Sequence, residues 1–238
     1  MKLMRGGAFA AALKMTVIIA ATLAGCDSMP GRPTQAEMPI RPTAVKDFAQ
    51  LYGENCAGCH GADGKFGAAL SLNNPVYLAL VDDAAMRRVI SNGVAGTAMP
   101  PFAISAGGAM TDEQIDIVAG GIRSRWAGNG AGLLAGAPPY SAASGDAGRG
   151  ASVYAEYCAS CHGADGSGGA KAGSIVDGSY LSLVSDQNLR TIIIAGRPDL
   201  GHPDWENYVV GKPMTAEQVA DVVAWLAAKR PAALARNL

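Results

Sequence analysis

The pentapeptide Cys-x-x-Cys-His occurs twice in this chain, and this repeat constrains the fold more than any other feature of the sequence. The first copy runs from Cys56 to His60 and the second from Cys158 to His162. Together the copies hold four of the five cysteines and two of the three histidines in 238 residues. We therefore expect each half of the chain to fold around one copy.

The spacing of each copy indicates covalent attachment of haem. Two thiols three positions apart can add to the two vinyl groups on one edge of the ring, and the next residue, a histidine, can bind the iron. Redox-active disulfides and a zinc site with four ligands are the alternatives, but neither uses the adjacent histidine. Two covalently bound haem c groups are therefore expected, held by Cys56, Cys59, His60, Cys158, Cys161 and His162.

The N-terminus has the pattern of an export signal. Lys2, Arg5 and Lys14 precede an apolar run over residues 15–24, which is too short to span a bilayer. The run ends in Leu-Ala-Gly-Cys, which resembles the lipobox of bacterial lipoproteins and implies cleavage before Cys26 and lipid modification of its thiol. An ordinary secretory signal with an incidental cysteine is the alternative.

Composition excludes some partners and indicates a bound group. Without residues 1–25 the chain keeps 16 Lys and Arg against 20 Asp and Glu, a balance that argues against nucleic-acid binding and against a polybasic patch that binds membranes. Aromatic residues are 6% of the chain and 31 residues are glycine, so two small domains lack core-forming side chains. A bound macrocycle would supply the missing apolar surface.

The two halves also match outside the motifs, which indicates duplication. Tyr52 and Tyr154 precede the two motifs at the same distance, and residues 60–64 match 162–166, both at an offset of 102. Further along, 90–93 match 193–196 at an offset of 103, and 110–114 match 214–218 at 104. The halves should therefore share one fold.

Each half predicts three main helices and no strand. The first should run from Val45 to Cys56 in one half and from Gly148 to Cys158 in the other. The second should begin at an acidic cap and stop at a glycine, and the third should open with a capping box and bury one apolar face. The predicted caps, stops and buried positions are Asp82 or Asp83, Asp186, Gly93, Gly196, Thr111 with Gln114, Thr215 with Gln218, Ile115, Val118, Ile122, Val219, Val222, Val223 and Leu226.

With these features in place, both halves resemble class I c-type cytochrome domains. The resemblance implies an all-α fold with an N-terminal helix crossing a C-terminal helix. Gly150, Tyr154 and Trp225 match the family's small and aromatic residues at that crossing. In the first half Phe48 replaces the small residue and Gly121 replaces the tryptophan, so we expect these two to be in contact.

The resemblance divides the chain into two tandem cytochrome c domains with preceding and connecting segments. The proline-rich tether shows little apolar periodicity, and the linker is rich in Gly, Ala, Ser and Pro. The expected division is a cleaved signal peptide over 1–25, the tether over 26–43, the first domain over 44–127, the linker over 128–145 and the second domain over 146–238.

The two iron sites are expected to differ in their distal ligands. Met99, in Gly96-Thr-Ala-Met-Pro-Pro, matches the family's distal methionine loop. At the corresponding place the second half has His202, in Gly-His-Pro. Three possibilities remain open there: His202 as the ligand, Met214 as the ligand, or an open sixth position. A methionine opposite histidine raises the reduction potential, whereas two histidines would give the second haem the lower one.

These features predict an electron-transfer protein rather than an enzyme. The expected protein is lipid-anchored to the periplasmic side of a bacterial cytoplasmic membrane and has no small-molecule substrate. It would pass single electrons from a quinol-oxidising complex or periplasmic dehydrogenase to a terminal oxidase or reductase of a respiratory chain. The alternatives are a diheme peroxidase or thiosulfate-oxidising enzyme with a displaceable ligand, and a fixed cytochrome subunit of a larger respiratory complex.

Overall fold

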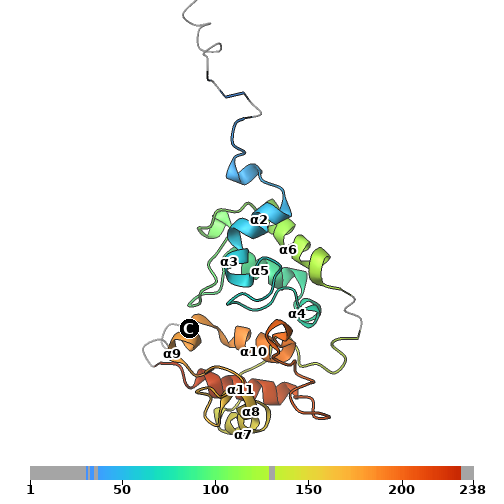
Figure 1. The fold of residues 1–238 in the computed structure, drawn as a ribbon, viewed down its shortest axis with the longest axis vertical. Coiled ribbons are helices and arrows are strands. Elements are labelled where there is room, and N and C mark those ends of the chain that lie inside the picture. Colours follow the sequence, from blue (N-terminus) through green and yellow to red (C-terminus); the bar gives the residue numbers. More distant parts are fainter. Residues whose placement is uncertain (1–30, 32, 35–36, 129–131, 232–238) are drawn as a thin grey trace, which may run out of the picture. The chain divides into compact units, whose positions relative to one another are not determined.

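The computed structural model describes residues 31, 33–34, 37–128 and 132–231, and within these residues the regular secondary structure is helical (Figure 1). The predicted all-α class is confirmed. The predicted signal peptide and Cys26 lie outside the described residues. In the described part of the chain, no helix combines the length and the apolar character that a membrane span requires.

The chain divides into one unit that ends at Arg41 and a second that begins at Pro42. The described residues of the first unit include a turn in which the backbone N–H of Glu37 donates to the carbonyl of Thr34 at 2.9 Å. The second unit holds both Cys-x-x-Cys-His motifs. We refer to residues 42–127 as the first half, to 128–145 as the linker and to 146–231 as the second half.

The two halves contain the same helices in the same order, apart from the 3₁₀ turn η2 (Pro42–Ala44) that precedes the first set. The first half continues with α2 (Phe48–Asn55), α3 (Ala57–His60), α4 (Pro75–Leu80), α5 (Asp83–Asn92), η3 (Ile104–Ala106) and α6 (Asp112–Trp126). The second half has α7 (Ala147–Tyr157), α8 (Ala159–His162), α9 (Gly178–Leu183), α10 (Asp186–Ala195), η4 (Pro198–Leu200) and α11 (Ala216–Ala227).

Side-chain caps fix where several helices begin. The capping boxes predicted at Thr111 and Thr215 are both present. The predicted start of the first helix at Val45 is wrong: α2 begins at Phe48 because the Asp47 carboxylate accepts a hydrogen bond from the Gln50 N–H at 2.8 Å. The cap of α10 is Ser185 rather than the predicted Asp186, since the Ser185 hydroxyl accepts from the Asn188 N–H.

Each half buries its core where its first long helix packs against its last. Helix α2 packs against α6, and α7 packs against α11 (Figure 1). The apolar face predicted for the last helix is buried in both halves. Its residues are Ile115, Val118 and Ile122 in α6, and Val219, Val222, Val223 and Leu226 in α11.

The crossing is filled in opposite ways in the two halves. In the second half Gly150 lies against α11, where an added Cβ would come within 2.1 Å of the Asp221 carbonyl oxygen. In the first half a Cβ on Gly121 would come within 2.0 Å of the Phe48 ring, so the predicted contact is confirmed. The first half takes its indole from Trp126 instead, whose ring meets that of Tyr52 edge-on at 5.2 Å between centroids.

The linker is bound to the second half through its backbone. The buried guanidinium of Arg190 donates to the carbonyls of Pro139, at 2.7 and 3.0 Å, and of Tyr140, at 3.1 Å. The Gln187 amide also donates to the Tyr140 carbonyl, at 2.8 Å. Pro139 and Tyr140 of the linker are therefore held against α10 by hydrogen bonds.

Candidate functional site

Each Cys-x-x-Cys-His motif forms a single helical turn at the end of a longer helix. In the first half Cys56 ends α2 and begins α3, with its N–H donating to the Tyr52 carbonyl at 2.8 Å. The N–H of His60 donates back to the Cys56 carbonyl at 3.0 Å. The second half repeats both bonds at 2.9 and 3.1 Å, between Cys158 and Tyr154 and between His162 and Cys158. The helical turn places both thiols and the imidazole near one side of the backbone.

A backbone carbonyl orients the imidazole of each motif. His60 Nδ1 lies 2.9 Å from the Leu70 carbonyl oxygen, and His162 Nδ1 lies 2.8 Å from that of Gly173. A carbonyl only accepts, so in each ring Nδ1 carries the proton and donates it. Nε2 then keeps its lone pair for a metal ion, the arrangement that metal-binding histidines use.

The first thiol of each motif is held in its neutral form. Burial, together with the neighbouring Cys59, raises the pKa of Cys56 to about 11. Burial and Cys161 raise the pKa of Cys158 to about 12. Cysteines that act as nucleophiles or exchange disulfides have lowered pKa values, because the thiolate is their reactive form. The environment of these motifs therefore does not favour thiolate chemistry.

His202 lies opposite His162 in the second half. The centroids of the two imidazole rings are 6.1 Å apart and their planes are inclined by 55°. The Tyr208 ring meets the His202 ring edge-on at 5.4 Å. His202 Nδ1 is buried and has no hydrogen-bond partner among the described residues. Burial, with the nearby His162 and Arg197, lowers the pKa of His202 to about 4, so this imidazole is neutral at pH 7.

This pair of rings fits a haem iron held from both sides. Two imidazoles that bind one metal ion from opposite directions have centroids about 6 Å apart, because each metal–nitrogen bond is about 2 Å and each nitrogen lies about 1 Å from its ring centre. The separation of 6.1 Å agrees with that arrangement. His162 is free to present Nε2 to a metal ion, since it is oriented through Nδ1.

Met99 occupies the place in the first half that His202 occupies in the second. The Val94 N–H donates to the Met99 carbonyl at 2.9 Å, and the Arg197 N–H donates to the His202 carbonyl at 3.1 Å. The glycine before each donor packs against the same loop: a Cβ on Gly93 would come within 2.6 Å of the Met99 oxygen. The half-buried Met99 side chain is thus carried by the loop that carries the distal residue in the other half.

Met214 lies in the hydrophobic core of the second half and is 1% exposed. Its N–H donates to the Trp205 carbonyl at 2.9 Å. The corresponding Met110 donates to the Phe102 carbonyl at 2.7 Å and is 3% exposed. The two methionines are therefore equivalent core residues that each precede a capping threonine.

Two residues near His202 carried no recognisable signal in the sequence. Tyr208 covers the His202 ring and donates its hydroxyl proton to the Ile193 carbonyl at 3.1 Å. Arg197 is 7% exposed and contacts Asp199 in its own half and the Gly67 and Ala69 carbonyls in the other. Neither belongs to a motif, and the corresponding residue of the first half, Val94, gives no indication of the role of Arg197.

Comparison with protein families agrees with this duplicated architecture. A family model described as cytochrome c oxidase, cbb3-type, subunit III matches the chain twice, over residues 43–120 and 145–226. Among solved structures, a chain of the Kuenenia stuttgartiensis reducing HAO-like protein complex Kustc0457/Kustc0458 is similar at 18% identity and a TM-score of 0.44. That match covers 82% of this chain and 100% of the other.

Proposed function

The chain belongs to the family of cytochrome c oxidase, cbb3-type, subunit III, and from that premise we propose that it is a membrane-anchored carrier of single electrons between a respiratory donor and a terminal oxidase or reductase. Its two tandem cytochrome c domains hold two covalently bound haems, which serve electron transfer. The attachment residues are Cys56, Cys59, Cys158 and Cys161. Each haem supplies an iron that gains and loses one electron.

The proposed ligands differ between the halves. His60 and Met99 hold the first iron, and His162 and His202 hold the second. The observation that carries this assignment is the 6.1 Å separation of the two facing imidazoles in the second half. Met214 makes the same backbone bond as Met110 of the first half, which supports its role as a core residue rather than a ligand. A thioether opposite imidazole raises the potential of the first site above that of the second.

The proposed setting is the periplasmic face of a bacterial cytoplasmic membrane. Cys26 would carry the lipid, and the proline-rich segment over 26–43 would let the protein reach partners at the membrane. A quinol-oxidising complex or a periplasmic dehydrogenase would be the donor. With both irons fully coordinated by protein, no position is left for a small-molecule substrate.

The test is a redox titration of the full-length holoprotein beside His202→Met, followed by optical and magnetic spectroscopy. We expect the lower of the two midpoint potentials to rise in the variant, and its spectrum to change from that of two imidazoles to that of imidazole and thioether. Met214→Leu is the control, and we expect it to leave both spectra unchanged.

Two outcomes would contradict the proposal. An unchanged low-potential haem in His202→Met, with a ligand change in Met214→Leu, would make Met214 the ligand. Cyanide binding to the ferric wild-type protein at the second haem would show an open or displaceable position, and so would favour an enzyme.

A further inference from the structure

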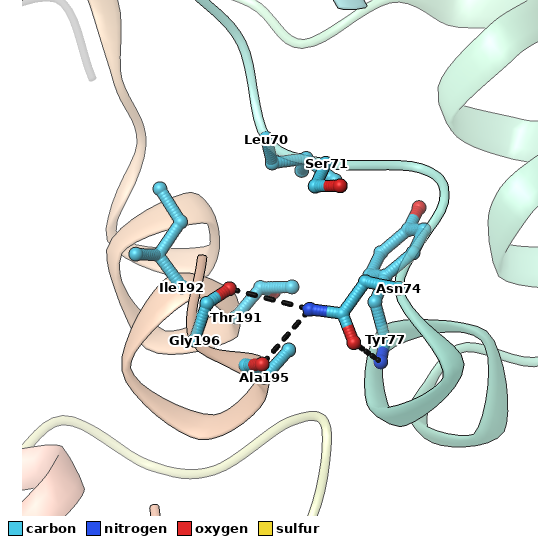
Figure 2. Close-up of a pocket in the computed structure, with 8 residues that line it drawn as sticks. All are labelled: Leu70, Ser71, Asn74, Tyr77, Thr191, Ile192, Ala195 and Gly196. Carbon is cyan, nitrogen blue, oxygen red and sulfur yellow. Dashed lines mark hydrogen bonds between the residues drawn. The ribbon is translucent and has the colours of Figure 1, made fainter. Parts of the chain in front are cut away.

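Two loops from opposite halves meet within the second unit of the chain. Residues 66–70 follow the first Cys-x-x-Cys-His motif, and residues 195–199 lead to His202. Figure 2 shows Leu70 and Ser71 on one side of this contact and Ala195 and Gly196 on the other. The amide of Asn74 bridges the two sides by donating to the Ala195 carbonyl at 2.8 Å.

The strongest contact between the loops is made by Arg197. Its guanidinium donates to the Ala69 carbonyl at 2.8 Å and to the Gly67 carbonyl at 3.0 Å. It also forms two bonds with the Asp199 carboxylate, at 3.0 and 2.8 Å. Asp199 in turn accepts the Phe66 N–H at 2.8 Å. Both members of this ion pair are buried, with side chains 9% and 2% exposed.

The loop that Arg197 binds is attached directly to the first haem motif. The Ala69 N–H donates to the Cys59 carbonyl at 2.9 Å, and the Leu70 carbonyl orients His60. Gly67 fits so closely that a Cβ on it would come within 2.2 Å of the Cys59 carbonyl oxygen. A shift of this loop would therefore move the group that orients the proximal histidine of the first half.

The backbone of the same arginine is paired with His202. The Arg197 N–H donates to the His202 carbonyl at 3.1 Å, and the His202 N–H donates to the Arg197 carbonyl at 3.0 Å. In the first half Val94 makes the first of these bonds with Met99 but has no guanidinium. The loop geometry is common to both halves, and the first-half loop also contacts the other half, since the Ala98 N–H donates to the Leu183 carbonyl at 3.3 Å. Arg197 differs in making its contact with the other half through a charged side chain.

We propose that Arg197 is a positioning residue that couples the two haem sites, through the continuous chain of covalent and hydrogen bonds from His60 by way of Leu70, Ala69 and Arg197 to His202. By fixing the geometry of both sites, this chain of bonds sets the rate at which one electron passes between them. The transfer oxidises one site and reduces the other by one electron, and no bond or proton is exchanged. The proposal rests on the proposed ligation of the second haem by His202.

The experiment compares two double variants of the full-length holoprotein. Arg197→Val with Asp199→Asn removes the coupling pair without leaving a buried charge unpaired, and valine is the residue that the first half has in this position. Arg230→Val with Asp186→Asn is the matched control. Arg230 also pairs with an aspartate and donates to two carbonyls, those of Leu181 and Val184, but all its partners lie in the second half.

The first measurement is the low-spin magnetic resonance spectrum and midpoint potential of the His60-ligated haem. We expect both to shift in the Arg197 variant, although Arg197 belongs to the other half, and to stay unchanged in the control. The second measurement is the rate of electron exchange between the haems after photoreduction. We expect it to fall about tenfold, the lower end of the effect of losing an outer-shell partner of a metal site.

Equal spectra, potentials and exchange rates in the Arg197 variant and the control would overturn the proposal. These readouts are separate from the test of the proposed function. Failure of His202→Met to change the second haem would remove His202 as a ligand, whereas the effect of Arg197 on the first haem would still be measured. A changed first haem in the Arg230 control would show that the loss of any buried arginine and its aspartate partner has this effect, and would also contradict the proposal.

Discussion

Arginine side chains close the corresponding loops of both halves, although they come from different positions in the repeat. Arg123 donates to the carbonyls of Leu78 and Val81, and Arg230 donates to those of Leu181 and Val184. The acceptors are offset by 103 residues, as the repeat requires, but the arginines are offset by 107. Each of these carbonyls needs a hydrogen-bond donor, and an arginine at either of two positions in the repeat can supply it.

The hydrogen-bond partners of the buried Asp221 determine the pKa of its carboxyl group. Its carboxylate is 3% exposed and accepts from Arg149 Nε at 2.7 Å and Nη2 at 2.9 Å, and from the Asp146 N–H at 2.7 Å. The hydrogen bonds from Arg149 lower the pKa of Asp221 below its ordinary value of 3.8. A lowered folded-state pKa means that the stabilisation is fully present above pH 3.8 and is lost as the pH falls through the folded value.

We therefore expect Asp221→Asn to reduce the free energy of unfolding at pH 7 and to flatten its decline at acid pH. The measurement is urea unfolding of the wild type and the variant from about pH 7 to about pH 2.5. Glu217→Gln is the control, because Glu217 also pairs with Arg149 but is 73% exposed, and should change stability little. If the free energy of unfolding fell with pH in parallel for the wild type and Asp221→Asn, ionised Asp221 would not be the source of the acid sensitivity.

At the scale of helices, the crossing of α2 and α6 depends on Gly121. A methyl group there would come within 2.0 Å of the Phe48 ring, so we expect Gly121→Ala to destabilise the first half by about 1–3 kcal/mol through overpacking. An added Cβ on the adjacent Gly120 would meet no heavy atom within 4 Å outside its own stretch of helix. Gly120→Ala should therefore stabilise the helix by about 0.5–1 kcal/mol.

Thermal unfolding of the two glycine variants gives the comparison, and combining Gly121→Ala with Phe48→Ala should recover part of the loss. If both glycine variants changed stability in the same direction, the close contact with the Phe48 ring would not explain why position 121 requires glycine.

The helices themselves were largely predictable, because the signals that start and stop them are local. Thr111 and Gln114 form the predicted capping box, and Gly93 stops α5 where expected. The errors are also local: Asp47 caps α2 two residues after the apolar pattern begins at Val45, and Ser185 caps α10 one residue before the predicted Asp186. The sequence did not predict that Trp126 supplies the indole of the first half, because Trp126 lies in a later turn of α6 than Gly121, the residue that corresponds to Trp225.

For the whole molecule, Asn74 shows how one side chain serves both a helix and the contact between the halves. Its Oδ1 caps α4 by accepting from the Val76 N–H at 3.0 Å, while its Nδ2 donates to the Ala195 carbonyl. The corresponding residue of the second half is Asp177, which caps α9 in the same way. Asparagine at position 74 adds a donor that aspartate cannot supply.

Asn74→Asp should keep the cap and lose the contact between the halves. We expect it to reduce the free energy of unfolding by about 1–3 kcal/mol, because a buried acceptor then faces the Ala195 carbonyl. Asp177→Asn makes the reverse change at an exposed cap and should have an effect below about 0.5 kcal/mol. Equal effects of the two variants on denaturant unfolding of the holoprotein would contradict this role of Asn74.

Contacts of this kind are the part of the site that the sequence could not predict. The haem motifs and the loops of Met99 and His202 follow from short patterns and from their repetition. Arg197 instead binds carbonyls some 130 residues earlier in the chain, and a carbonyl acceptor is the same for every residue type. No feature of the arginine or of its acceptors marks the pair before the fold brings them together.

The opposite filling of the two helix crossings has a consequence for how the two copies can evolve. Recombination between repeats that exchanged only the last helix would bring the Trp225 side chain against Phe48 in one product and leave two glycines facing each other in the other. One product would be overpacked and the other would contain a cavity, and both would lose stability. The two helices of each crossing must therefore be exchanged together. This requirement opposes recombination events that would make the two copies identical by replacing a single helix.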